Sequence, residues 1–440
     1  MKSLKTTLPK YILLCLGLIL GLTLMQMTAL VAVAVIPVDS IQTNMEASAD
    51  FLCEKPVFFQ LDESHSGSVI DRYADSILLN ILYCYDSSHP LESVMRSAYY
   101  YTAEQNENEN LSDAVYGNIS ANKEYSRYWH GSIVILRPLL TFLTLPQIYI
   151  LLGCVMLLLF AALLFSVWKK LGWAPVLPLL FGSILMSFRY IPFSLEYTWT
   201  IPVMIISTII LLWGYEHYEK KQKATPFLLV LFLVTGSITA YLDFLTTETL
   251  TLLVPLAFYL ALSHKNAPVE KFRDGIKRLL PPGIAWVSGY LSCWPCKWML
   301  ATLILKENAF AAALNQAGER VYGEVDITGF LKYPLTLMRN LGCVFPFHYA
   351  GLYAFIPILT VVLGIAGFFY LFHKKNTLAL SGIYFLLMLV PYVRFLVLAN
   401  HAYLHCFFTY RAQFASVICL GFILIYGTDA AFFKKKRRKK

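Results

Sequence analysis

Two aspartates one helical turn apart are the residues in this sequence with the clearest potential for acid–base chemistry. Asp71 and Asp75 begin the segment DRYADSILLN and would face the same side of a helix. A carboxylate here could take a proton from a hydroxyl group, or bind a divalent cation such as Mg²⁺ or Mn²⁺. Helix chemistry offers another interpretation, with Asp71 as the N-cap and Asp75 stabilised by the helix dipole.

Polar and cationic residues next to apolar segments form a second set of candidates. Charges in or beside a bilayer are costly, so they usually mark a cavity or a binding site. Arginine can hold a phosphate through two hydrogen bonds, and lysine acts as a compact charge. The candidates for contacting a substrate or its phosphate are Tyr128, Trp129, His130, Arg137, Lys297, Arg394, His401 and Arg411.

The stretch SCWPCKW contains a Cys-x-x-Cys pair, Cys293 and Cys296, whose spacing suggests thiol–disulfide chemistry. A redox-active pair needs the start of a helix that follows a strand, whereas this pair lies inside an apolar helix. We therefore expect two buried small side chains, with Lys297 as the functional neighbour. Cys53 and Cys84 share one polar segment, and the sequence leaves a disulfide between them open.

Other chemistry has little support in the sequence. His401 and His405 are four residues apart and could share a metal ion on a helix, but no third ligand accompanies them. We therefore expect no metal site at this pair. Nucleotide-binding, serine-hydrolase and metalloprotease motifs are also missing from the sequence.

Long apolar segments must position all these side chains. Hydrophobic residues make up 58% of the 440 and charged residues only 14%. Apolar runs of about twenty residues at ~1.5 Å each can cross a bilayer core of ~30 Å, which predicts an all-α polytopic membrane protein with about ten transmembrane helices. The predicted spans are 11–36, 147–168, 174–191, 193–214, 226–245, 247–262, 281–305, 351–372, 377–398 and 406–427.

Clusters of Lys and Arg follow alternate spans, so all of them fall on one side of the membrane, as the positive-inside rule requires. Both termini are therefore predicted to be cytoplasmic. This topology, with lipid attraction, explains the net charge of +9 without a nucleic-acid partner. The predicted parts are a cytoplasmic N-terminus with its anchor (1–36), an acidic extracytoplasmic loop (37–130), a multi-span body (131–430) with an external segment at about 306–347, and a basic cytoplasmic tail (431–440).

The topology places the candidate charges in the extracytoplasmic half, which suggests a polar cavity that opens outward. Two external amphipathic helices are expected to lie on the membrane surface, over 73–85 and 328–342. The first span has a small-residue site at Ala32–Ala34 that signal peptidase could cut. Its apolar core is longer than that of a signal peptide, which favours an uncleaved anchor.

This layout resembles the type C glycosyltransferase superfamily, whose integral membrane enzymes use polyprenyl-phosphate-linked sugars. The likeness lies in one anchor span, a large external loop with an early Asp before an amphipathic helix, and a multi-span body with outward-facing charges. Individual segments also look like largely uncharacterised multi-pass proteins of Gram-positive anaerobic bacteria. These segments are 71–80, 126–140, 241–256, 293–298 and 400–411.

The resemblance implies an inverting transfer in which an external carboxylate deprotonates the acceptor hydroxyl, which then displaces lipid phosphate from the anomeric carbon. Asp71 would be this base, with Asp75 as the second candidate. The resemblance also implies that cations stabilise the leaving phosphate, for which Lys297, Arg394 and Arg411 are the candidates.

Two other functions stay open. A transporter or flippase for a lipid-linked or anionic substrate would use the same cations but would not need a carboxylate in the first loop. A non-catalytic scaffold would present the acidic loop to a partner in the cell envelope.

Overall fold

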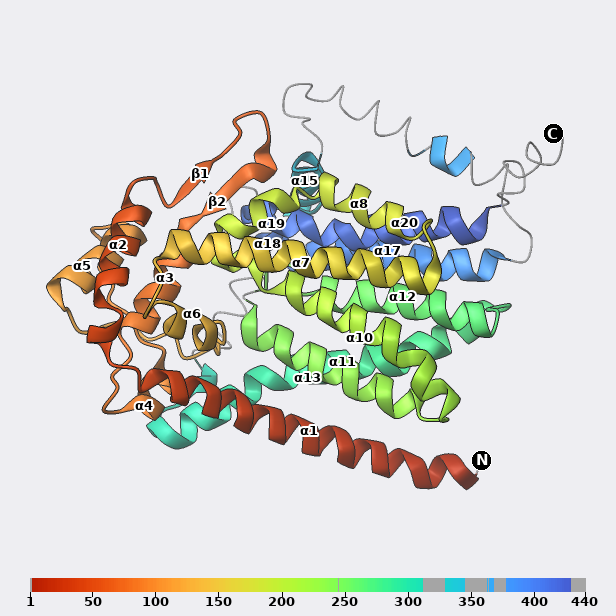
Figure 1. Ribbon diagram of the computed structural model, residues 1–440, viewed down its shortest axis with the longest axis horizontal. Coiled ribbons are helices and arrows are strands. Elements are labelled where there is room, and N and C mark those ends of the chain that lie inside the picture. Colours follow the sequence, from red (N-terminus) through yellow and green to blue (C-terminus); the bar gives the residue numbers. More distant parts are fainter. Residues whose placement is uncertain are drawn as a thin grey trace.

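The computed structural model describes residues 2–243, 245–311, 329–344, 362, 364–367 and 377–428. Long helices run side by side in an elongated bundle (Figure 1). The bundle contains α1 (Lys2–Ala34), α7 (Leu145–Leu171), α8 (Val176–Leu185), α10 (Thr200–Lys220), α11 (Ala224–Leu242), α12 (Leu250–Asn266), α13 (Phe272–Leu305), α17 (Leu378–Val397) and α20 (Phe414–Gly427).

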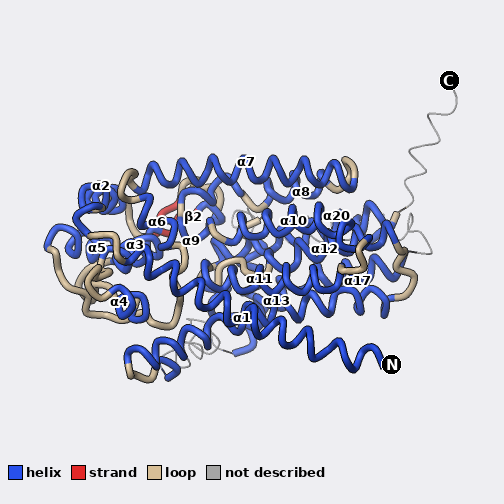
Figure 2. The backbone as a smooth tube through the Cα atoms, turned by 60° about the horizontal axis from the view of Figure 1, so that its bottom comes forward, coloured by secondary structure: helices blue, strands red, loops and turns tan. Residues whose placement is uncertain are grey.

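The segment that follows α1, residues 35–139, is called the polar segment and folds against one end of this bundle. It contains α2 (Gln42–Cys53), β1 (Phe58–Gln60), β2 (Val69–Asp71), α3 (Arg72–Tyr83), α4 (Pro90–Arg96), α5 (Glu107–Gly117) and α6 (Ile133–Leu139). The first residues of α1 and the last of α20 lie at the opposite end, and Figure 2 shows the same separation from a second direction. Short helices complete the junction: α9 (Leu195–Thr198), α15 (Lys332–Gly342), α18 (Ala399–Leu404) and α19 (Cys406–Thr409).

The apolar helices confirm a multi-pass membrane protein. Within the described residues, 6 helical segments are long and apolar enough to cross a membrane. They are Pro9–Ala34, Leu145–Leu171, Leu195–Lys220, Ala224–Leu242, Leu378–Val397 and Cys406–Gly427. The predicted total of about ten spans stays a prediction, as does the orientation of the termini.

The remaining predicted spans differ in their outcome. The span over 174–191 is wrong in length: α8 has 10 residues, only about 15 Å at ~1.5 Å each. The chain turns after it at Ser187, which has a left-handed φ of 49°. The span over 247–262 corresponds to the 17-residue α12, and that over 281–305 lies within α13. The span over 351–372 falls almost wholly outside the described residues, and the tail over 431–440 lies outside them.

The two predicted amphipathic helices are both present, but the first has different surroundings from those expected. Its apolar stripe and its polar residues Asp75, Ser76 and Asn80 are all buried, because α3 packs against α5 and α2. A helix covered on both faces does not lie on a membrane surface, so that part of the prediction is wrong. The second helix is α15, which packs against α17, α18 and α19.

Helices α11 and α13 approach each other so closely that glycines are required at the contact. A Cβ atom on Gly289 would lie 2.0 Å from the Leu233 carbonyl oxygen, and one on Gly236 would lie 2.1 Å from the Trp286 carbonyl oxygen. Small residues that let two backbones touch are a common basis of helix association in membranes.

We predict that Gly289→Ala destabilises the protein, because the added methyl group must push backbone away from backbone. Overpacking of this kind typically costs about 1–3 kcal/mol. Melting of the purified protein in detergent would show a lower Tm. Gly283→Ala is the matched control, since it lies on the same helix with no atom within 4 Å of its would-be Cβ. Equal Tm values for both variants would contradict the packing described here.

Candidate functional site

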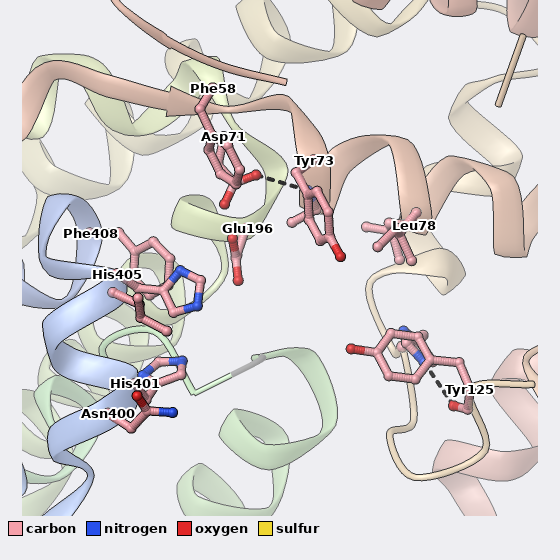
Figure 3. A pocket seen from close by; sticks show the side chains of 14 residues that line it. Phe58, Asp71, Tyr73, Leu78, Tyr125, Glu196, Asn400, His401, His405 and Phe408 are labelled. Carbon is pink, nitrogen blue, oxygen red and sulfur yellow. Dashed lines mark hydrogen bonds between the residues drawn. The ribbon is translucent and has the colours of Figure 1, made fainter. Parts of the chain in front are cut away.

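A cavity of about 470 Å³ lies where the polar segment meets the bundle. Its walls come from β1, β2 and α3 on one side and from α9, α18 and α19 on the other (Figure 3). The lining residues are Phe58, Asp71, Tyr73, Ala74, Ile77, Leu78, Tyr125, His130, Glu196, Asn400, His401, Leu404, His405 and Phe408. The cavity therefore combines acidic groups and imidazoles with aromatic and aliphatic walls.

Asp71, the first candidate base, is part of this lining. It is the last residue of β2, which pairs with β1 in an antiparallel hairpin, and it is also the N-cap of α3. One carboxylate oxygen, Oδ1, accepts a hydrogen bond of 2.8 Å from the Ala74 amide. Only 2% of the residue is exposed, and this burial raises the pKa of the Asp71 carboxyl to about 6.

Glu196 lies beside Asp71 in the cavity wall (Figure 3), and a hydrogen bond from its carboxyl group lowers the pKa of the Asp71 carboxyl. Such a bond requires a shared proton. Glu196 is 9% exposed, and its Oε2 atom has no hydrogen-bond partner among the described residues. The sequence placed Glu196 among the charges of the outer half without assigning it to the site. Its signal was an acid at the start of an apolar span.

Asp75, the second candidate base, is not part of the cavity lining. Its carboxylate accepts hydrogen bonds from the Leu195 amide at 2.9 Å, from the Ser194 hydroxyl at 3.2 Å and from the Tyr149 hydroxyl. Asp75 is fully buried, and burial raises the pKa of its carboxyl to about 7. The structure therefore gives Asp75 a structural position, as the acceptor at the start of α9.

The candidate histidines do lie at the cavity. His130 has a left-handed φ of 53°, and its ring packs 4.9 Å from that of Tyr125. Burial, with the nearby Lys297 charge, lowers the pKa of His130 to about 3, so its imidazole is neutral near pH 7. His401 lies within α18 and His405 separates α18 from α19, and their ring centroids are 4.9 Å apart.

The candidate cations Arg137 and Lys297 do not line the cavity. Arg137 donates hydrogen bonds to the carbonyl oxygens of Leu82 and Ile36, so it ties the end of α3 to the end of α1. The Lys297 ammonium is fully buried, donates to the Val94 carbonyl oxygen at 2.5 Å and lies 5.2 Å from the centre of the Trp129 ring. The expectation that Lys297 faces a substrate phosphate has no support in this geometry.

Arg394 and Arg411 also point to protein groups. Arg394 forms a buried ion pair of 2.9 Å with Glu248. Arg411 donates to the Gly67 carbonyl oxygen at 3.3 Å and lies 4.6 Å from the centre of the Tyr197 ring. The structure does not gather the predicted cations around one space.

Tyr128 and Trp129 are buried supports beside the cavity. The Tyr128 ring packs edge-on against the rings of Tyr125 and Trp294. The Trp129 indole donates a hydrogen bond of 2.9 Å to the Cys293 carbonyl oxygen. The sequence analysis did not identify four aromatic residues that line the cavity, because they come from distant parts of the chain and no sequence pattern links them. They are Phe58, Tyr73, Tyr125 and Phe408.

The described residues do not form a binding site for a divalent cation from protein ligands alone. No group of three or more His, Cys, Asp or Glu residues there is placed to hold a metal ion. Asp71 and Glu196 could supply two oxygen ligands, whereas Mg²⁺ and Ca²⁺ take six or more.

Comparison with known proteins yields no family assignment. No protein-family model, no curated protein and no solved structure matches this chain.

We predict that the protein loses stability between about pH 4 and pH 7 through its buried carboxyls. An unfolded Asp has a pKa of about 3.9, whereas burial raises the pKa of Asp75 to about 7. The folded state then holds a proton that the unfolded state releases, so this stabilisation is complete below pH ~4 and is lost as the pH rises through ~7, by at most ~1.4 kcal/mol per pH unit.

Melting of the wild-type protein and of Asp75→Asn across this pH range measures the effect. The variant cannot titrate at this position, so its Tm should depend less on pH, although the weakened contacts to α9 lower it overall. Glu63→Gln, at an exposed position, is the control. A variant that keeps the full wild-type pH dependence would show that Asp75 is not the group responsible.

Proposed function

We propose that this chain is a membrane glycosyltransferase that moves a sugar from a polyprenyl-phosphate donor to an acceptor on the extracytoplasmic side. The observation that carries the proposal is the position of Asp71, whose carboxyl lines a cavity of about 470 Å³ at the junction of the polar segment and the bundle. The proposal includes the topology expected from the charge pattern, with both termini in the cytoplasm and residues 37–130 outside.

Asp71 acts as the general base in this proposal. It removes the proton from the acceptor hydroxyl as the oxygen attacks the anomeric carbon, and the bond from that carbon to the lipid phosphate breaks with inversion. A pKa of about 6 leaves most Asp71 ionised near pH 7 while keeping it more basic than an ordinary carboxylate. The leaving phosphate keeps the electron pair of the broken bond.

The cavity also supplies contacts suited to a sugar. Carboxylate oxygens accept hydrogen bonds from sugar hydroxyls, and the rings of Phe58, Tyr73 and Phe408 offer flat apolar faces. His401 and His405 are the lining groups that carry a positive charge when protonated, which suits the side where the phosphate departs.

The two alternatives fit this cavity less well. A carrier for an anionic substrate should surround it with cations, yet Arg137, Lys297, Arg394 and Arg411 do not line the space while two carboxyl groups do. A scaffold needs no cavity lined by two carboxyl groups, and orienting two buried carboxyl groups toward each other costs free energy that a purely structural role does not require.

Asp71→Asn should abolish transfer while leaving the fold intact. Asparagine is as good an N-cap as aspartate, so α3 keeps its first turn, but it cannot accept the proton. We expect transfer to fall by about 10²–10⁴-fold, the usual contribution of a general base. The assay follows transfer in membranes supplied with polyprenyl-phosphate sugar, with Asp62→Asn in the outer loop as the matched control. Unchanged transfer in Asp71→Asn would exclude this base.

The pH dependence of transfer offers a separate test. A base must be deprotonated to act, so the rate should fall about tenfold per pH unit below the Asp71 pKa of about 6. The hydrogen bond from Glu196 lowers the pKa of Asp71. Glu196→Ala should therefore move the acid limb to higher pH, whereas Glu196→Gln, whose amide still donates, should leave it nearly in place. Identical limbs in both variants would remove Glu196 from the mechanism.

A further inference from the structure

Two buried cysteines lie face to face where α15 packs on α18 and α19, at the side of the molecule that holds the cavity. The register of this contact is fixed by Asn340 of α15. Its side-chain amide donates a hydrogen bond of 2.9 Å to the Ala402 carbonyl oxygen, and its Oδ1 accepts a hydrogen bond of 2.7 Å from the Thr409 hydroxyl. The Gln413 side-chain amide also donates a hydrogen bond of 3.0 Å to the Asn340 carbonyl oxygen.

This register brings the thiols together. The contact between α15 and α18 is parallel, because the Thr336 hydroxyl donates a hydrogen bond of 3.3 Å to the Ala399 carbonyl oxygen and Asn340 pairs in the same way with Ala402. Continuing this register by one helical turn places Cys343 beside Cys406. The two thiols are close enough to be each other's strongest electrostatic neighbour. Cys343 is 2% exposed and Cys406 is 7% exposed, and both are free thiols here.

We propose that Cys343 and Cys406 form a disulfide that joins α15 to α19. Because the parallel register of α15 and α18 holds the two residues side by side, side-chain rotation can bring the sulfurs to bonding distance. The cross-link would fix the helix pair whose residues His401, His405 and Phe408 line the cavity. The inference does not rest on the proposed transferase activity.

The oxidant is a disulfide compound, small or protein-bound, outside the membrane. The Cys406 thiolate attacks one sulfur of the oxidant and displaces a thiolate. The Cys343 thiolate then attacks the Cys406 sulfur of this mixed disulfide and releases the second thiolate. Two protein thiols are oxidised, and one disulfide is reduced to two thiols.

Other cysteine pairs suggested by the sequence are not arranged in this way. The Cys53 thiol donates to the Asn108 carbonyl oxygen at 3.5 Å, and the Cys84 thiol to Asn80 Oδ1 at 3.4 Å. The Cys293 thiol donates to Gln26 Oε1 at 3.7 Å. The pairing of Cys343 with Cys406 could not be predicted from spacing, because the two residues are far apart in the chain.

Peptide mapping of the full chain tests the proposal. The protein is purified in detergent without reductant, treated with oxidised glutathione, denatured, alkylated at free thiols and digested. We expect a cross-linked peptide that joins Cys343 to Cys406 and that yields two newly alkylated cysteines only after reduction. Cys53→Ser is the control and should leave this cross-link unchanged. Complete alkylation of both cysteines before reduction, even after the glutathione treatment, would overturn the proposal.

Thermal melting gives a second readout that does not depend on peptide recovery. Reduction should lower the Tm of the oxidised wild-type protein by several degrees, because the open chain between the two positions regains conformational freedom when unfolded. The double variant Cys343→Ser/Cys406→Ser should melt at the same temperature with and without reductant. A wild-type Tm that does not respond to reductant, together with an intact double variant, would count against the cross-link.

Discussion

The buried carboxylate of Asp75 is the interaction on which the site depends. It accepts hydrogen bonds from the backbone at the start of α9, from Ser194 and from Tyr149 of α7, and so fixes α3 to the bundle. Amides at the start of a helix have no partner within the helix, and a buried carboxylate satisfies several of them at once. Since Asp71 lies one turn before Asp75 and Glu196 follows Leu195, this contact also sets the two cavity carboxyls opposite each other.

The buried cations serve the same junction from other sides. Arg137 binds carbonyl oxygens at the ends of α3 and α1, and Lys297 binds the carbonyl of Val94 in α4. A buried charge is tolerated when hydrogen bonds replace its water, and helix C-termini offer unpaired carbonyl groups for that purpose. In this protein, charges near the membrane therefore mark the attachment of the polar segment to the bundle.

This distinction explains what the sequence could and could not predict. Apolar runs with lengths near the bilayer thickness are a local property of the sequence, so they predicted the long helices directly. Helix α8 ends earlier than predicted, at a turn that no local sequence pattern indicates. The stripe of Ile77, Leu78, Ile81 and Leu82 correctly predicted α3. Its burial on both faces depends on α2 and α5, which pack on it from elsewhere in the chain. The prediction that Lys297 lies near a phosphate rested on its residue type alone. The sequence does not reveal that the Val94 carbonyl oxygen accepts a hydrogen bond from its ammonium group.

The two interpretations of Asp71 that the sequence left open turn out to be compatible. Capping occupies Oδ1, which accepts a hydrogen bond from the Ala74 amide, while the carboxyl group still forms part of the cavity lining beside Glu196. The cap also holds the side chain in one orientation, which a general base needs before its substrate arrives. Burial raises the basicity of the group and the cap restrains its rotation, so the structural role of Asp71 prepares the chemical role that we propose for it.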